Sequence, residues 1–397
     1  MKYNFDEIIE RSNTASVKYD LREMFFGAGD VIPMWVADMD FRTPDFVMNA
    51  IRERAEHPVL GYSIRPPEYN NALKDWVARH HKWIIDTDWI SFSPGIVPAL
   101  NTTVLAFTKP GDRIIVQPPV YFPFFSAVKK NGRVLSQNPL CLVNGRYEMD
   151  YAGFERQCKK GAAMAIVCNP HNPGGIAWRK DELKKLADIC LKYNVLIVSD
   201  EIHADLVNIG HNHTVLASLS SAIANRTITM MAPSKTFNMA ALSTASVIIS
   251  NGKFRKVYND LVQNLHIDMG NVFGTVASTA AYTYGDEWLM QLLVYINRNI
   301  DFLEAYLAKN IPEIKLIRPE ATYMAWLDCS GMNMNDEELK QFMIEKARLG
   351  LNQGVQFGIG GNSFMRMNLA CPKATLVKAL TQLSEAMVKL RVMQPQQ

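Results

Sequence analysis

The middle of the chain alternates short apolar segments with amphipathic ones, and this pattern limits the fold more than any other feature. Apolar runs are expected to form strands at 113–117, 163–168, 195–199, 227–232 and 245–250. Amphipathic segments are expected to form helices at 44–57, after Gly95, and at 121–131 and 180–193. Apolar strands separated by helices are typical of a mainly parallel sheet covered on both faces. The sequence therefore predicts an α/β fold.

The last third of the chain departs from this alternation. After a turn expected at 285–287, a long helical pattern runs over 288–310 and leads into a strand at 323–328 and further helices. This order suits a smaller α+β domain, completed by the irregular N-terminal arm. A chain of 397 residues is long enough for two domains with a core each. We expect the arm and part of the small domain over 1–50, the large domain over 51–287 and the C-terminal small domain over 288–397.

Composition narrows the class of partner. Hydrophobic residues make up 48% of the chain and charged residues 20%, and the net charge is only +3 without a long basic run, so nucleic acid is not an expected partner. No apolar stretch is long enough for a membrane span, and acidic residues in MKYNFDEIIERSN argue against an export signal. The six cysteines lack the spacing of a zinc site or a disulfide framework. They are expected to be reduced thiols of a cytoplasmic protein.

Two ionisable residues follow expected strands. Asp200 lies at the carboxyl end of the strand 195–199, where open α/β sheets bind their ligands. A carboxylate there suits a protonated pyridine nitrogen, and it equally suits the cap of a following helix. Lys235 lies in an uncharged stretch after another strand, where burial of its ammonium is costly unless the charge is paired or removed. Bonding to an aldehyde removes that charge, whereas the alternative is an exposed loop lysine.

Further polar residues are expected in loops and at strand ends. Asn172 belongs to a turn-rich loop after the strand 163–168, and its amide both donates and accepts hydrogen bonds. The segment ending at Gly95 precedes a helix whose first N–H groups suit a phosphate. Tyr121 suits either stacking on a cofactor ring or a place in the core. Arg366 interrupts an apolar, strand-like stretch, so it needs an anion, either a bound carboxylate or a structural ion pair.

Taken together, these segments resemble the fold-type I pyridoxal-phosphate enzymes over nearly the whole chain. Within that group, four motifs look like the bacterial cystathionine β-lyase branch of the class I/II aminotransferases: PMWVADMDF at 33–41, CNPHNPGG at 168–175, DEIH at 200–203 and APSKTFN at 232–238. The resemblance implies an aspartate-aminotransferase-like large domain with a mainly parallel seven-stranded sheet, and a smaller α+β domain. It also implies pyridoxal 5'-phosphate as the cofactor, no metal, and a homodimer with shared active sites.

The resemblance implies roles for individual residues as well. Lys235 would carry the cofactor and act as general base, Asp200 would pair with the pyridinium nitrogen, and Tyr121 would stack on the ring. Other cofactor contacts are implied at the phenolic oxygen for Asn172 and His203, and at the phosphate for Gly95, Ile96, Ser234 and, from the neighbouring subunit, Tyr62. Arg366 would bind the substrate carboxylate, with help from Asn172 and the backbone around Ala37.

One position departs from the aminotransferase pattern. Those enzymes usually carry a phosphate-binding arginine eight residues after the lysine, and Ser243 stands there instead. The function expected is β-elimination from a sulfur amino acid such as L-cystathionine, which yields pyruvate, ammonia and a thiol. Two alternatives stay open: an aminotransferase, which shares the first steps, and a regulatory protein that keeps the fold without the chemistry.

Overall fold

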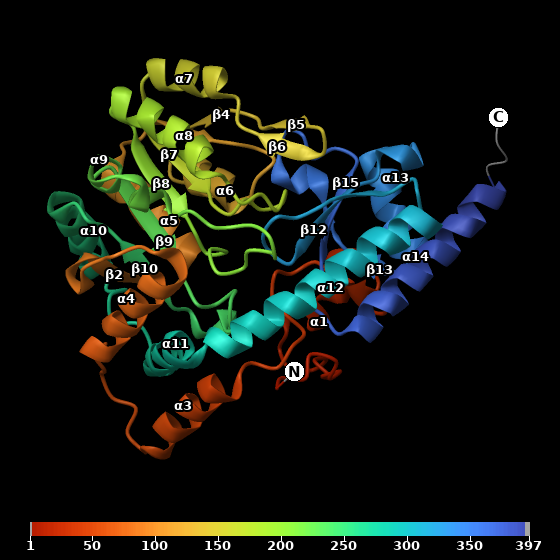
Figure 1. The fold of residues 1–397 in the computed structure, drawn as a ribbon, viewed down its shortest axis with the longest axis horizontal. Coiled ribbons are helices and arrows are strands. Elements are labelled where there is room, and N and C mark those ends of the chain that lie inside the picture. Colours follow the sequence, from red (N-terminus) through yellow and green to blue (C-terminus); the bar gives the residue numbers. More distant parts are fainter. Residues whose placement is uncertain (1, 394–397) are drawn as a thin grey trace.

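A seven-stranded sheet forms the centre of the computed structural model, which describes residues 2–393 (Figure 1). The strand order is β2-β10-β9-β8-β7-β3-β4, and only β10 runs antiparallel to its neighbours. The predicted mainly parallel seven-stranded sheet is therefore confirmed. Its strands are β2 (Ile90–Ser93), β3 (Arg113–Val116), β4 (Val134–Gln137), β7 (Ala162–Cys168), β8 (Leu196–Asp200), β9 (Thr227–Met231) and β10 (Ala245–Ile248).

Helices cover both faces of this sheet, because successive strand side chains point to opposite sides. In β8, Leu196 and Val198 belong to the cluster formed with α5, α6 and α10, whereas Ile197 belongs to the cluster formed with α7, α8 and α9. The first set comprises α5 (Ile96–Phe107), α6 (Pro123–Lys129) and α10 (Gly252–Asn264). The second comprises α7 (Tyr151–Lys159), α8 (Lys180–Lys192) and α9 (Ser221–Ala224).

A second sheet, of four antiparallel strands in the order β11-β12-β15-β14, lies in the C-terminal part of the chain. Figure 1 shows the helix α12 crossing the molecule with α14 beside it. The strands are β11 (Lys315–Ile317), β12 (Met324–Asp328), β14 (Asn352–Gln353) and β15 (Phe364–Asn368), and the helices are α12 (Asp286–Asn310), α13 (Asp336–Gln341) and α14 (Lys373–Met393). The boundaries 1–50, 51–287 and 288–397 stay a prediction.

The N-terminal arm joins the two parts. Its strand β1 (Ile32–Pro33) pairs with β13 (Leu349–Gly350), far along the chain. The arm also contains α1 (Val17–Asp20) and α2 (Arg22–Phe26), and beyond it α3 (Asp45–Glu56) and α4 (Pro67–His81) pack on α11 (Val272–Tyr284). The hairpin β5 (Cys141–Val143) and β6 (Arg146–Glu148) stands apart as a small sheet. None of the helices within residues 2–393 is long and apolar enough to cross a membrane.

Two expectations about local structure are wrong. The turn expected at 285–287 is the first turn of α12, because Asp286 and Glu287 favour the positive end of a helix dipole and Gly285 precedes them. The helix expected at 121–131 is shorter, since α6 begins at Pro123, a residue suited to the first helical position. Tyr121 therefore lies before the helix.

Candidate active site

A cavity of about 360 Å³ lies where β2, β7, β8 and β9 end. Strands β2 and β9 point the same way as β7 and β8, so the segments that follow all four meet at one edge of the sheet. The structure brings the predicted site residues together at this edge, with the exception of Tyr62. The predicted residues that line the cavity are Ala37, Gly95, Ile96, Tyr121, Asn172, Asp200, His203, Ser234, Lys235 and Arg366.

Lys235 lies in a turn that follows β9, and it is half-buried at the cavity wall. Its Nζ donates a hydrogen bond to the carbonyl oxygen of Ala37 at 2.6 Å. No carboxylate among the described residues forms an ion pair with it, and burial lowers the pKa of Lys235 to about 8. A neutral amine is a nucleophile and a base, so this lysine is suited to both tasks near neutral pH. The alternative of an exposed loop lysine is wrong.

Asp200 ends β8 and is buried, with one carboxylate oxygen accepting a hydrogen bond from the Ile202 backbone at 3.2 Å. No helix starts after it, because residues 202–205 form a turn, so the alternative of a helix cap is wrong. Burial raises the pKa of Asp200 to about 7. A buried acid without a cationic partner in hydrogen-bond reach suits a protonated ring nitrogen, which would restore its ordinary ionisation.

The raised pKa gives a testable pH dependence of stability. Asp200 favours its protonated form in the folded cofactor-free protein, so its stabilising contribution is complete below the unfolded pKa of about 4 and is lost as pH rises through about 7. Between about pH 5 and pH 8, the cofactor-free wild type is expected to lose roughly 2–3 kcal/mol more unfolding free energy than Asp200→Asn. Urea unfolding at both pH values measures this difference, and parallel pH profiles of the two proteins would contradict it.

Arg366 lies on β15 and is buried among neutral acceptors. Its guanidinium donates to Asn172 Oδ1 at 3.0 Å, to the Trp35 carbonyl at 3.0 Å and to Asn352 Oδ1 at 2.7 Å. Its Nε has no partner within the described part of the chain, and no described carboxylate pairs with it, so the alternative of a structural ion pair is wrong. Burial lowers the pKa of Arg366 to about 10. An unneutralised guanidinium at a cavity wall is a site for a carboxylate.

The N-terminus of α5 supplies anion-binding groups at the same cavity. Gly95, the residue before the helix, has a φ of 147°, which other residues rarely adopt, and no side chain caps the helix. The backbone N–H groups around Ile96 are therefore available to a phosphate, together with the hydroxyl of Ser234. Lys235 and Arg366 are the only cationic side chains among the described lining residues. Because the resemblance assigns Lys235 to the cofactor's aldehyde and Arg366 to the substrate carboxylate, phosphate binding would depend on neutral donors.

His203 and Tyr62 lie in opposite environments. His203 is buried at the cavity, its Nδ1 has no partner among the described residues, and burial, with Lys235 nearby, lowers the pKa of the imidazole to about 3. A neutral imidazole with a free nitrogen suits hydrogen bonding to a ligand oxygen. Tyr62 is 98% exposed and lines none of this cavity.

Sequence reasoning did not single out some of the lining residues. Trp35 lies inside a motif of which only Ala37 received a role, and its carbonyl is one of the acceptors of Arg366. Asn352 pairs with Arg366 across β14 and β15, but it belongs to no recognisable motif. Asn352 could be found only from the pairing of β14 with β15, which the sequence alone does not provide. Cys168 and Phe122 also line the cavity.

The chain matches the family model described as aminotransferase class I and II over residues 29–383. The chain belongs to this family. A curated relative, cystathionine beta-lyase PatB of Bacillus subtilis (strain 168), is 42% identical over 97% of this chain and 100% of its own. The family and the lyase branch that the motifs indicated are thereby confirmed.

Two solved structures of similar proteins share nearly the whole fold. One is a pyridoxal-phosphate-bound protein of Clostridium difficile 630 assigned as an aminotransferase, with a TM-score of 0.96 and 44% identity over 97% of this chain and 100% of that one. The other is cystalysin of Treponema denticola, which contains pyridoxal 5'-phosphate, with a TM-score of 0.95 and 36% identity over 98% and 100% of the two chains. They confirm the predicted aspartate-aminotransferase-like fold class.

The residues of this family member fit that cofactor. A half-buried lysine of lowered pKa suits its aldehyde, a buried acid of raised pKa suits its ring nitrogen, and an uncapped helix N-terminus suits its phosphate. The aromatic ring of Tyr121 and the free Nδ1 of His203 lie at the same cavity. The role of each residue toward the cofactor stays a prediction.

Proposed function

We propose that this enzyme is a pyridoxal-phosphate-dependent carbon-sulfur β-lyase. It cleaves L-cystathionine, or a similar thioether derivative of L-cysteine, to pyruvate, ammonia and a thiol. The observation that carries the proposal is the pair formed by the half-buried amine of Lys235, whose pKa is lowered, and a buried guanidinium without an acidic partner, Arg366, at one cavity. The names of the relatives, a cystathionine beta-lyase and cystalysin, support this branch.

In this proposal, Arg366 binds the substrate and Lys235 moves its proton. Arg366 binds the α-carboxylate of the amino acid, and Asn172 and Asn352 hold the guanidinium in place. The Lys235 amine, held by the Ala37 carbonyl, removes the Cα proton as general base, and a pKa of about 8 suits this task near neutral pH. Pyridoxal phosphate, when bound, supplies the electron sink that makes this proton acidic. Loss of a thiolate from Cβ then completes the elimination. The thiolate takes up a proton, and water hydrolyses the released aminoacrylate to pyruvate and ammonia.

The cavity walls favour an uncharged group next to Cβ of the substrate. Apart from Lys235 and Arg366, the lining has no cationic side chain, and much of it is aromatic or aliphatic, as at Trp35 and Phe122. A carboxylate on Cβ or Cγ of the substrate, as in aspartate or glutamate, would lose its hydration there without gaining a cation in return. The second carboxylate of L-cystathionine is separated from Cβ by the sulfur and three carbons and carries its own ammonium beside it. A thioether or thiol substituent fits such a wall better than the acidic side chain of aspartate or glutamate does.

Product analysis tests the proposal directly. Purified enzyme loaded with pyridoxal phosphate is expected to release pyruvate and a free thiol from L-cystathionine in the absence of any keto acid. Absence of both products, with amino transfer on addition of a keto acid, would favour the aminotransferase. A colourless protein in which borohydride fixes no pyridoxyl group on Lys235 would favour a non-catalytic protein instead.

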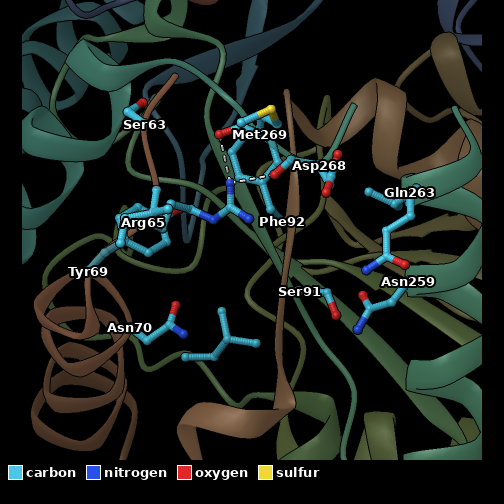
Figure 2. Close-up of a pocket in the computed structure, with 13 residues that line it drawn as sticks. Ser63, Arg65, Tyr69, Asn70, Ser91, Phe92, Asn259, Gln263, Asp268 and Met269 are labelled. Atoms are coloured by element: carbon cyan, nitrogen blue, oxygen red, sulfur yellow. Dashed lines mark hydrogen bonds between the residues drawn. The ribbon is translucent and has the colours of Figure 1, made fainter. Parts of the chain in front are cut away.

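We propose further that the enzyme is a homodimer in which Tyr62 reaches the phosphate site of the neighbouring subunit. The extended segment around Tyr62 exposes three more apolar side chains, Val59, Leu60 and Ile64, which is unusual for a free surface. Next to this segment, Arg65 closes a second cavity by donating to the carbonyls of Asp268 and Met269 (Figure 2). A two-fold axis would place two such segments over two equivalent sites.

Mixing of inactive variants tests the shared site. Tyr62→Ala and Lys235→Ala homodimers are each expected to be weakly active or inactive, the first through reduced affinity for pyridoxal phosphate. After subunit exchange, half of the dimers would be mixed, and each would contain one site with both residues intact, so about a quarter of the wild-type activity is expected to return. Failure of activity to return, although subunit exchange is verified by mass, would refute the shared site.

A further inference from the structure

The buried carboxylate of Asp205, outside the cavity, connects helix α4 to the turn at 233–238 that contains Lys235. Asp205 accepts hydrogen bonds from Trp76 Nε1 at 2.9 Å, from His81 Nε2 at 2.8 Å and from Thr236 Oγ1 at 2.7 Å. Burial acts to raise the pKa of Asp205, but the bonds from His81, Thr236 and Trp76 bring it below its usual value. Asp205 is therefore ionised, and its charge is satisfied by three donors.

Thr236 directly follows Lys235, so its hydroxyl fixes one side of the lysine turn. Thr236 is fully buried, and residues 233–238 form one continuous turn with no strand or helix of its own. The other side of the turn is fixed by Asn238, whose amide donates to the carbonyls of Met39 and Phe41 at 3.0 Å and 2.8 Å. The lysine backbone is thus anchored at two points one residue and three residues away.

A second acid–histidine pair lies behind Asp200. Glu201 accepts hydrogen bonds from Ser199 Oγ at 2.7 Å and from His213 Nε2 at 2.8 Å. The rings of His81 and His213 meet edge to face, with their centroids 5.3 Å apart. The two pairs therefore form one buried polar layer beneath the two residues that would hold the cofactor's aldehyde and ring nitrogen. The carboxylates of Asp205 and Glu201 are satisfied in this layer, whereas Nδ1 of His213 has no partner among the described residues.

We propose that Asp205 is a positioning residue for Lys235, acting through the hydroxyl of Thr236. The proposal rests on the function proposed for Lys235. Asp205 itself lies outside the cavity lining and touches neither substrate nor cofactor. Its bond to Thr236 fixes the direction in which the lysine side chain leaves the turn, so that Nζ reaches the Ala37 carbonyl and the cavity. Displacement of a reacting group by about 1 Å is enough to cost about 100-fold in rate.

Substitutions at Thr236 test the proposal. Thr236→Val keeps the shape of the side chain and removes its hydroxyl, whereas Thr236→Ser keeps the hydroxyl. In the valine variant, kcat is expected to fall by roughly 10- to 100-fold with KM nearly unchanged, and the serine variant is expected to recover most of this loss. The cofactor-free valine variant is also expected to develop the visible absorption of bound pyridoxal phosphate about 10-fold more slowly, which reports on Lys235 without any substrate.

A matched control separates positioning from stability. Trp76→Phe removes a different donor to Asp205 and leaves the bond from Thr236 in place, so it is expected to lower the melting temperature while kcat and the rate of cofactor capture stay near wild type. Asp205→Asn provides a second variant should Thr236→Val not fold. Wild-type kcat and capture rate in Thr236→Val, or equal losses in Trp76→Phe, would overturn the proposal. Failure of the proposed function itself would show separately, as wild-type protein in which borohydride fixes no cofactor on Lys235.

Discussion

Lys235→Ala is expected to lower the rate of pyruvate formation by at least about 10³-fold and to abolish fixation of the cofactor by borohydride. General base catalysis alone is worth about 10²- to 10⁴-fold, and the covalent hold on the cofactor is lost as well. The physical basis is the location of the amine: it lies half-buried at the cavity, donates a hydrogen bond to the Ala37 carbonyl, and has a pKa lowered to about 8. Steady-state release of pyruvate and mass spectrometry after borohydride treatment measure the two effects.

Lys373→Ala is the matched control for this experiment. Burial lowers the pKa of Lys373 to about 8 as well, but this lysine lies at the start of α14 and does not line the cavity. Its replacement is expected to leave activity and cofactor fixation within about two-fold of wild type. Addition of ethylamine to Lys235→Ala is expected to restore part of the rate, because a small amine can enter the space left by the side chain. Full activity of Lys235→Ala would refute the assignment.

Arg366→Met is expected to lower kcat/KM by about 30- to 5,000-fold, chiefly through KM. Loss of one partner of a buried, hydrogen-bonded charge pair costs about 2–5 kcal/mol, and a carboxylate left in the cavity would have no other cation than Lys235. Arg366→Lys is expected to recover only part of the loss, because an ammonium cannot bind a carboxylate through two parallel hydrogen bonds. Steady-state kinetics measure the effect with L-cystathionine and with its carboxyl-free analogue, the same thioether without the α-carboxylate of its cysteine half.

The carboxyl-free analogue decides what Arg366 does. If Arg366 binds the carboxylate, the analogue is a poor substrate of the wild type, and Arg366→Met changes its turnover little. Equal losses for both substrates would indicate a structural role instead. Arg133→Met serves as the control for removal of a buried arginine. Arg133 does not line the cavity, and it donates a hydrogen bond of 2.8 Å to Thr108 Oγ1. This variant is expected to lose stability and to keep KM.

The parts of the fold that the sequence could predict are those that depend on local patterns. Strands such as β8 are continuously buried, so an apolar run marks them, and the polar residues that follow must then meet at one edge of the sheet. This is why Asp200 and Lys235 could be placed in one site before their contacts were known. The division into two domains, which rests on the change of pattern after residue 285, stays a prediction.

The parts that the sequence could not predict depend on contacts between distant segments. Asn352 meets Arg366 through a strand register, and Asp205 meets Thr236 through a hydrogen bond across 31 residues. The start of α12 was misjudged because the same acidic residues suit a turn and a first helical turn. For Arg366, the sequence left two hypotheses open, a bound carboxylate and a structural ion pair. The hydrogen-bond partners decide between them, because the guanidinium donates to neutral acceptors where an ion pair would need an acid.

The exposure of one cysteine affects how the reaction itself can be followed. Five of the six cysteines are buried, among them Cys168 in the cavity, where burial raises the pKa of the thiol, whereas Cys141 on β5 is exposed. A thiol reagent that detects the released product would therefore also modify the folded enzyme at Cys141. The number of enzyme thiols that react with the reagent should equal one per chain in the folded enzyme and rise to six on unfolding. Cys141→Ser would provide an enzyme whose only prompt thiol signal is its product.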